Sequence, residues 1–262
     1  MALAPSVGSV AALWRFPVKS MGGEELGEAE LTSQGIFGDR AFAVMDVETG
    51  KIVSAKSVRL FPHVLDCKAT FVESPRFGRP LPAVRIALPN GRAVNSDSPD
   101  ADGTLSDFFQ RHVTLARAEA AGIDSPVPVG TFFDAFPMSV LTTSTLARLA
   151  ELAPQSRFDP RRFRMNVIVG TSTPGFPENE WIGREITVGD MVRLRLAKPD
   201  VRCAMTTLAQ GELPHDADVL RTLVRHNSIH HGADGGLYPC AGVYAMVGNA
   251  GTVRRGDPVR LA

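Results

Sequence analysis

The sequence predicts a mainly β protein with a few helices, built from antiparallel sheets that form barrels or sandwiches. Short apolar runs alternate with polar residues, as in Met191 to Ala197, where Val192, Leu194 and Leu196 alternate with arginines. Turn sequences such as Pro89-Asn90-Gly91-Arg92 separate neighbouring runs, and only three segments have helical spacing. Strands this close together favour an antiparallel arrangement over parallel strands linked by helices.

The first half of the chain is predicted to consist mostly of strands. Apolar alternation and turns such as Glu48-Thr49-Gly50-Lys51 set their limits. The predicted strands are Val7 to Phe16, Leu26 to Leu31, Ala41 to Val47, Ile52 to Ala55, Val64 to Val72 and Val84 to Leu88. One helix is predicted from Leu105 to Arg111.

A loop-rich stretch from Ala120 to Thr131 is the predicted domain boundary, because glycine and proline recur in it. It divides the chain into a first domain of residues 1–120 and a second domain of residues 121–262. Both are predicted to be β-barrel-like.

In the second domain, Thr142 or Thr143 is predicted to cap a helix that runs to Leu152, and a second amphipathic helix is predicted around Val219 to Val224. Pro199 is predicted to end the strand before it, because proline has no backbone donor. The predicted strands are Val167 to Val169, Trp181 to Val188, Met191 to Ala197, Val243 to Val247 and Gly256 to Leu261.

The charge balance excludes a global electrostatic attraction to nucleic acid or to an acidic membrane surface. Lys plus Arg and Asp plus Glu number 28 each in 262 residues, so the formal net charge is zero. Any anion must therefore be held by local basic groups. The apolar run Val7 to Trp14 is too short to span a membrane. We expect no nucleic-acid or membrane partner.

The three cysteines, Cys67, Cys203 and Cys240, are odd in number, widely spaced and without a CxxC pair. They do not make a disulfide framework or a structural zinc site, and they are too few for an all-cysteine iron–sulfur cluster. Reduced thiols of this kind fit the cytoplasm, where we expect the protein.

Cys203 directly follows Arg202 in a loop at a strand end. A neighbouring cation stabilises a thiolate, which is both the nucleophilic and the metal-binding form of cysteine. The alternative for a single cysteine is a half-buried structural residue.

Several polar residues share one placement, at the end of a predicted strand or in the turn after it. Such residues can meet at one rim of a barrel, where ligand sites form. Arg and Lys beside Ser and Thr suit phosphate, and Asn beside Arg suits a heterocycle. Each residue alone is equally explained as a solvated strand end. They are Lys19, Ser20, Arg40, Lys56, Thr142 to Ser144, Arg164, Asn166, Arg202 and Cys203.

Other chemistries are less well supported. Adjacent His230 and His231 point to opposite sides of a strand and lack a third ligand at a defined spacing, so we interpret them as a surface loop. A Cys–His hydrolase would need Cys203 with His215, His226 or His230, but no family signature supports it. The turn from Gly232 to Gly236 lacks the strand–GxGxxG–helix context of a dinucleotide site.

The motifs as a set resemble the MOSC family, and in particular its two-part members, the mitochondrial amidoxime-reducing component and bacterial relatives. The resemblance covers nearly the whole chain. The motifs are Phe16-Pro17-Val18-Lys19-Ser20, Gly38-Asp39-Arg40, Ser54-Ala55-Lys56, Phe163-Arg164-Met165-Asn166, Arg202-Cys203-Ala204-Met205-Thr206-Thr207 and Gly256-Asp257-Pro258-Val259. It implies an N-terminal MOSC β-barrel domain followed by a MOSC domain.

The resemblance also implies a molybdenum cofactor, a molybdopterin with Cys203 as the protein ligand to molybdenum and catalytic residue. By the same similarity, Lys19, Ser20 and Arg40 would hold the cofactor phosphate. Arg164 and Asn166 would hold the pterin, with Thr142 and Tyr244 near it, and Arg202 would favour the thiolate. The family's reductases remove oxygen from N-hydroxylated small molecules.

The electron donor implied by this chemistry is an external protein of ferredoxin, flavoprotein or cytochrome type, since no ferredoxin-like segment follows the last predicted strand. The sequence leaves two other functions open. One is a sulfur carrier or sulfurtransferase that uses a Cys203 persulfide. The other is a cofactor-binding module without turnover.

Overall fold

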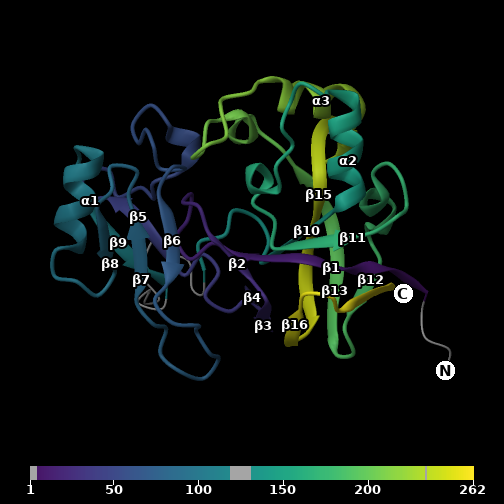
Figure 1. Cartoon of the computed structure of the whole chain (residues 1–262), viewed down its shortest axis with the longest axis horizontal. Helices are drawn as coiled ribbons and strands as arrows, with labels where there is room; N and C mark the ends of the chain where they lie inside the picture. Colours follow the sequence, from purple (N-terminus) through teal and green to yellow (C-terminus); the bar gives the residue numbers. More distant parts are fainter. Residues whose placement is uncertain (1–4, 119–130, 234) are drawn as a thin grey trace.

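The computed structural model describes residues 5–118, 131–233 and 235–262. Its fold is mainly β, as predicted, with three α-helices in the described part. Figure 1 shows two parts side by side: a smaller part with α1 and β5 to β9, and a larger part whose long strands are coloured green and yellow. The predicted boundary, residues 120–131, lies almost entirely outside the described residues, so the division at residue 120 stays a prediction.

The larger part is a closed barrel of seven strands. Each strand bonds to the next in the order given, and β10 bonds back to β15, which closes the ring. The strands are β10 (Met138–Thr142), β11 (Val167–Gly170), β1 (Ser6–Arg15), β17 (Pro258–Leu261), β12 (Glu185–Val188), β13 (Val192–Val201) and β15 (Gly236–Asn249). Two further strands, β2 (Glu24–Leu26) and β14 (Ser228–His231), extend this sheet from β1 and β15. Inward-facing Val140, Ile186, Leu194 and Val243 fill its core.

Strand β1 brings the beginning of the chain into the barrel. It lies between β11 and β17, with Val10 opposite Val169 and Ser9 opposite Pro258. In Figure 1 the purple β1 crosses the green strands. Because Lys19 and Ser20 follow β1 directly, this placement holds both residues at the junction of the two parts.

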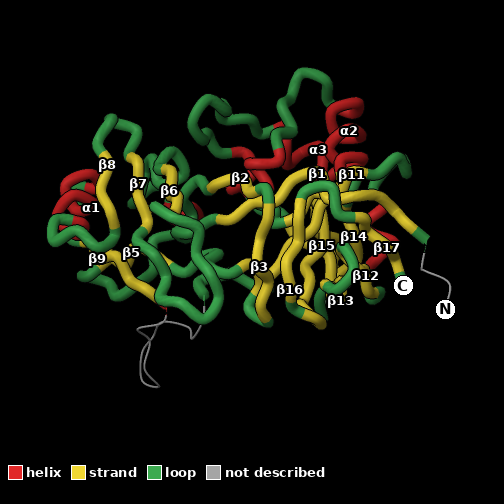
Figure 2. The backbone as a smooth tube through the Cα atoms, turned by 60° about the horizontal axis from the view of Figure 1, so that its bottom comes forward, coloured by secondary structure: helices red, strands yellow, loops and turns green. Residues whose placement is uncertain are grey.

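The remaining strands form three small sheets, which Figure 2 shows beside the barrel. Two of them pack over a second core that includes Val44, Phe61, Ile86 and Leu105, whereas the third packs into the barrel core through Leu31, Ile36 and Val253. The sheets are β16 (Gly251–Arg254), β3 (Glu28–Thr32) and β4 (Gly35–Ile36); β5 (Phe42–Asp46) and β9 (Val113–Arg117); and β6 (Lys68–Phe71), β7 (Val84–Ala87) and β8 (Ala93–Asn95).

The helices match the predicted segments with shifted ends. In α2 (Thr143–Leu152) the hydroxyl of Thr142 accepts a hydrogen bond from Thr145 N at 3.1 Å, which confirms the predicted cap. Helix α3 (Asp218–His226) packs beside α2 on the barrel (Figure 1). Helix α1 (Ala101–Phe109) begins and ends earlier than predicted, because Gln110 takes a left-handed backbone conformation.

Several strand predictions were wrong in extent. The segment after Trp181 turns at Gly183, with φ 84°, so β12 begins only at Glu185. The predicted strand from Ile52 is a single bridge to Met45, because Ser54 caps a short 3₁₀ turn. Elsewhere, the predicted strand Leu26 to Leu31 is divided between β2 and β3, and Val64 to Val72 is ordered as a strand only in β6.

Pro199 does not end its strand. Strand β13 continues to Val201, and Pro199 pairs with Val243 between two register shifts. At such bulges the ladder has no need of the donor that proline lacks. The strand therefore carries the chain two residues further, up to Arg202.

Candidate functional site

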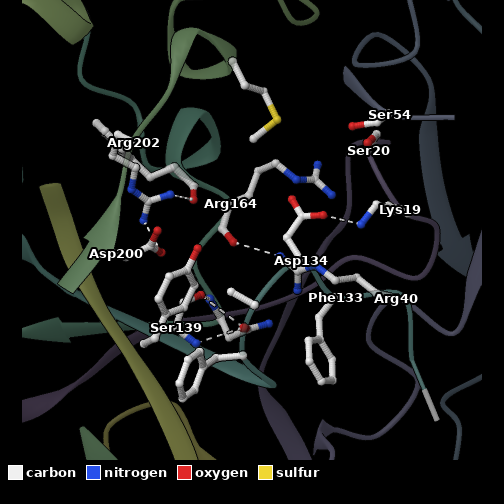
Figure 3. A pocket seen from close by; sticks show the side chains of 16 residues that line it. Lys19, Ser20, Arg40, Ser54, Phe133, Asp134, Ser139, Arg164, Asp200 and Arg202 are labelled. Atoms are coloured by element: carbon white, nitrogen blue, oxygen red, sulfur yellow. Dashed lines mark hydrogen bonds and ion pairs between the residues drawn. The ribbon is translucent and has the colours of Figure 1, made fainter. Parts of the chain in front are cut away.

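A cavity that is partly open to solvent lies where the two parts of the molecule meet. Figure 3 shows its lining, which comes from strand ends and turns of both parts. The predicted site residues that line it are Lys19, Ser20, Arg40, Arg164, Asn166, Arg202 and Tyr244. The cavity therefore brings together residues up to 225 positions apart, Lys19 and Tyr244, although Tyr244 lies within β15 and not at a strand end.

Three of the lining residues have a left-handed backbone conformation that non-glycine residues rarely adopt. The φ angles are 65° at Ser20, 50° at Arg40 and 52° at Arg164. Such conformations cost free energy and persist where the surrounding structure imposes them, typically at ligand sites.

Lys19 binds the wall that residues 132–134 form. Its Nζ donates to Phe132 O at 2.8 Å and pairs with the carboxylate of Asp134, which also lies 3.5 Å from Lys56 Nζ. Burial lowers the pKa of Lys19, and Asp134 opposes that shift. Asp134 was not predicted as a site residue. It is half exposed, so water or a competing anion can reach it.

Arg40 and Arg164 share the ring of Phe16. The guanidinium carbons lie 5.1 Å and 4.3 Å from its centroid. Arg40 pairs with buried Asp39 and donates to the carbonyl oxygen of Arg164 at 3.3 Å. The positively charged guanidinium groups of Arg40 and Arg164 are thus held close together beside the ring of Phe16.

Arg164 is the one cation of the cavity that has no carboxylate partner among the described residues. Its Nη1 donates to Met21 O, across the junction, while its Nη2 is buried without any hydrogen-bond partner. Burial lowers the pKa of the guanidinium, and Arg40 lowers it further. Figure 3 shows the side chain reaching across the middle of the cavity towards Lys19 and Asp134.

Arg202 differs because its guanidinium is turned inward and fully partnered. It pairs with Asp200 at 2.6 Å and donates to Ala241 O and Phe163 O. The predicted pairing of its charge with the neighbouring thiol is absent from these contacts. Successive residues of an extended chain point to opposite sides, so the guanidinium and the Cys203 side chain diverge.

Asp200 and Tyr244 form the far wall. Burial raises the pKa of Asp200 to about 6, although Arg202 opposes the shift. Burial also raises the pKa of Tyr244, and the carboxyl of Asp200 adds to that effect. The tyrosine ring stacks on Phe136 with centroids 5.4 Å apart.

Asn166 lines the cavity, but its amide already has protein partners. Its Oδ1 accepts from Ser139 N and Oγ at 3.2 Å, and its Nδ2 donates to Asp39 Oδ2 at 3.1 Å. It braces the cavity wall through these bonds.

Thr142 is not among the lining residues, contrary to expectation. Thr142 is fully buried, and its hydroxyl donates a hydrogen bond to a carboxylate oxygen of Glu178 at 2.7 Å while it caps α2. The contact with Glu178 spans 36 residues and could not be read from local sequence.

Cys203 lies between two lining residues along the chain, Arg202 and Met205, and its side chain is exposed. The other two cysteines, Cys67 and Cys240, are buried. The alternative of a half-buried structural role for Cys203 is therefore wrong.

The structure adds lining residues that strand ends alone did not reveal. Asp200 stands two residues before Arg202, which could have signalled a buried ion pair. The others gave no such signal: Ser54, Phe133, Asp134, Ala135, Phe136, Ser139, Phe163 and Met205. The histidines His230 and His231 lie in β14 rather than in a loop, and no cluster of three metal-ligating side chains occurs among the described residues.

Comparisons with known proteins agree with this architecture. The model of the MOSC domain matches residues 128–260, and that of the MOSC N-terminal beta barrel domain matches residues 7–136. The chain belongs to the MOSC family. No α-helix in the described ranges has the length and apolar character needed to cross a bilayer.

Relatives of this MOSC protein are named for one activity. Mitochondrial amidoxime-reducing component 1 of Homo sapiens is 26% identical over 291 residues, which cover 99% of this chain and 84% of that protein. Mitochondrial amidoxime reducing component 2 of Macaca fascicularis is 25% identical, with coverages of 97% and 83%. The crystal structure of the YUAD protein from Bacillus subtilis is 16% identical with a TM-score of 0.48, covering 97% of this chain and 94% of that one.

Proposed function

We propose that this MOSC protein binds a molybdenum cofactor and reduces N-hydroxylated small molecules by removing their oxygen. The relatives named above are amidoxime-reducing components, and their sequences align along nearly the whole chain. The cavity is the place where the cofactor would bind, since it collects the basic side chains that an anionic pterin needs.

The observation that carries the proposal is the uncompensated charge of Arg164. Three of the four cavity cations have a carboxylate partner: Lys19 with Asp134, Arg40 with Asp39 and Arg202 with Asp200. Arg164 has none in the described part of the chain, and its Nη2 donor is unused. A buried cation with a free donor is costly unless an anionic ligand completes it. The residues present therefore fit an anionic cofactor.

The residues divide the task of holding that cofactor by their positions. Lys19, Ser20 and Arg40 would bind its phosphate, with Ser20 fixed through the bond from Ala55 N to its Oγ at 3.1 Å. Arg164 would donate its free N–H groups to the pterin part. Tyr244 would border it as an apolar wall, because its phenol stays neutral. Asn166 and Thr142 would not contact the cofactor directly. Asn166 would hold Ser139 in place, and Thr142 would hold the beginning of α2.

Cys203 would supply the protein ligand to molybdenum, since a soft thiolate suits that metal. When bound, the cofactor would supply the two-electron redox chemistry that accepts oxygen from the substrate. The share of the chain is to hold the cofactor and leave one side open to a small molecule. Electrons would come from an external protein of ferredoxin, flavoprotein or cytochrome type. We place the protein in the cytoplasm on the ground of its unpaired cysteines.

Metal analysis of protein from a cofactor-competent host tests this proposal. We expect about one molybdenum per chain in the wild type, as one thiolate site implies, and almost none in Cys203→Ala. Cys67→Ala is the matched control, because Cys67 is buried and outside the cavity, and it should keep its metal. Metal retained in Cys203→Ala, or absent from the wild type, would contradict the proposal. Reduction of an amidoxime by the loaded protein with a chemical donor then separates an enzyme from a cofactor-binding module.

A sulfur carrier is the second candidate, favoured by the exposure of Cys203 among otherwise buried cysteines. Only an accessible thiol can accept and pass on a sulfur atom. Mass spectrometry of the native protein would then find one extra sulfur on Cys203 and no dependence on metal. An unmodified Cys203 in molybdenum-containing protein would exclude this function.

A further inference from the structure

The two ends of the Cys203 loop are tied down by two buried arginines that come from different segments. We propose that Arg162 and Arg202 form a reciprocal clamp that fixes the position of Cys203, and that Arg162 is a positioning residue of the site. Arg162 does not line the cavity and belongs to none of the site motifs above. It lies in the short 3₁₀ turn Pro160–Phe163, just before Arg164.

The first half of the clamp precedes Cys203. Arg202 is 8% exposed, and its Nη1 donates to Phe163 O at 2.8 Å. Its Nε and Nη2 both donate to Ala241 O in β15. The main chain entering Cys203 is therefore bonded to the barrel and to the turn that carries Arg162.

The second half follows Cys203. Arg162 is 1% exposed, and its Nη1 donates to Thr206 O at 3.3 Å and Leu208 O at 3.2 Å. Its Nη2 donates to Pro214 O at 2.8 Å. Thr206 in turn bonds back to Cys203 O through both its N and its Oγ1, at 3.2 and 3.1 Å.

The two halves depend on each other. Arg202 in the cysteine loop donates to Phe163, which adjoins Arg162, and Arg162 donates to the cysteine loop. A displacement of the main chain at Cys203 would break charge-assisted hydrogen bonds, and water cannot replace them because both arginines are buried. The main chain of Cys203 is held, and its side chain remains exposed.

Stability alone does not account for Arg162. Among the described residues its hydrogen-bond partners are all main-chain carbonyls. No ion pair therefore offsets the desolvation cost of burying the guanidinium charge. A well-packed apolar side chain avoids that desolvation cost. What an apolar residue cannot do is gather carbonyls of residues 157, 206, 208 and 214 at one point. Arg162 therefore contributes the precise placement of the Cys203 loop, which an apolar side chain at this position would not provide.

The use of the clamp rests on the proposed function, because holding a thiol rigidly matters when it must meet a bound metal. The clamp itself can be tested without cofactor. Cys203 is the only exposed cysteine, so N-ethylmaleimide labelling of the native chain reports on it alone. Amide hydrogen exchange over residues 203–208 reports on the loop.

The experiment compares Arg162→Gln with Arg161→Gln in cofactor-free protein. Arg161 is the matched control, since it stands in the same turn but pairs with Asp159 and Glu212 at the surface. We expect Arg162→Gln to speed exchange over residues 203–208 by about tenfold and to change the labelling rate of Cys203, with exchange in β7 unaltered. The control should stay within about twofold of wild type. Arg162→Lys, which keeps the charge but fewer donors, should fall between them.

Equal rates in Arg162→Gln and Arg161→Gln would overturn the clamp, as would a uniform rise in exchange across the whole chain. If Arg162→Gln does not fold, Arg162→Lys decides the matter: wild-type exchange in the loop overturns the proposal, and faster exchange confined to it supports it. In protein from a cofactor-competent host, Arg162→Gln should also lose molybdenum although every lining residue is intact. A wild type without molybdenum would refute the proposed function, and the clamp would then be judged by the hydrogen-exchange data alone.

Discussion

The two walls of the cavity use basic residues in different ways. On the wall of Lys19 and Arg40, each cation has a carboxylate neighbour and keeps about a sixth of its side chain exposed. On the wall of Arg164 and Arg202, both guanidiniums are buried and take main-chain carbonyls as partners. The first wall can exchange a counterion for a ligand, whereas the second holds its cations through the main chain of the protein.

Within the second wall the two arginines differ again. Arg202 has an ion pair and a complete set of acceptors, while Arg164 has an unused donor and no carboxylate partner in the described residues. A buried cation with a complete set of partners stabilises the fold, whereas one with an unused donor favours the binding of an anionic ligand. Stability and anion binding should therefore respond differently to the same substitution at the two positions.

The largest effect is expected from Arg202→Met. It leaves the buried carboxylate of Asp200 and two carbonyls without their partner, so the free energy of unfolding should fall by about 3–5 kcal/mol. Urea unfolding followed by tryptophan fluorescence measures it. The exposed pair of Arg221 and Asp218 is the control, and Arg221→Met should cost less than about 1 kcal/mol. If Arg202→Met and Arg221→Met lowered the free energy of unfolding equally, the buried ion pair would be no more important to stability than the exposed one.

Arg164→Met should reverse that pattern. The buried charge disappears together with its desolvation cost, so the free energy of unfolding should stay within about 1 kcal/mol of wild type. Sulfate binding, measured by calorimetric titration, should weaken by about 30- to 100-fold, because hydrogen bonds to a charged group are lost. A strongly destabilised variant that still binds sulfate would show Arg164 to be a framework residue like Arg202.

Acidification should strengthen anion binding through Asp200. Its pKa is raised to about 6, so the carboxyl becomes neutral as the pH falls from 7 to 5 and the cavity gains one positive charge. Sulfate affinity should then rise about fivefold, since sulfate keeps its charge in this range. The folded state holds this proton more tightly than the unfolded state, so ionisation of Asp200 lowers stability as the pH rises through about 6.

Asp200→Asn is the control for that pH effect. The variant has no carboxyl to titrate, so its sulfate affinity should be flat between pH 5 and 7 and close to the low-pH value of wild type. A slope that persists in the variant would assign the effect to another group near Asp200, such as Asp134.

The smallest effect is expected from Asp134→Asn. This carboxylate neutralises the charge of Lys19, so its loss should raise sulfate affinity about threefold at low salt, with less gain at high salt. Because Asp134 is half exposed, the free energy of unfolding should change by less than about 1 kcal/mol. Weaker sulfate binding would mean that Asp134 positions Lys19 for the anion and does not compete with it.

Local patterns were sufficient for most of the elements and for the basic residues that line the cavity. Alternation and turn residues placed Lys19, Arg40 and Arg202 at strand ends, and closing the barrel brings strand ends to one rim. The capped helix after Thr142 followed from short-range signals as well. The limits of strands were less predictable: Pro199 remained in β13 because its partner strand β15 accepts a bulge there.

By itself, the sequence indicated the basic residues that line the cavity, because strand ends and turns depend on neighbouring residues. Only the tertiary structure decided how each is used. It paired Arg202 with Asp200, Thr142 with Glu178 and Lys19 with Asp134, and among the described residues it left Arg164 without a carboxylate partner. Those pairings depend on register and barrel closure between segments far apart in the chain, and burial then sets the energy of each charge.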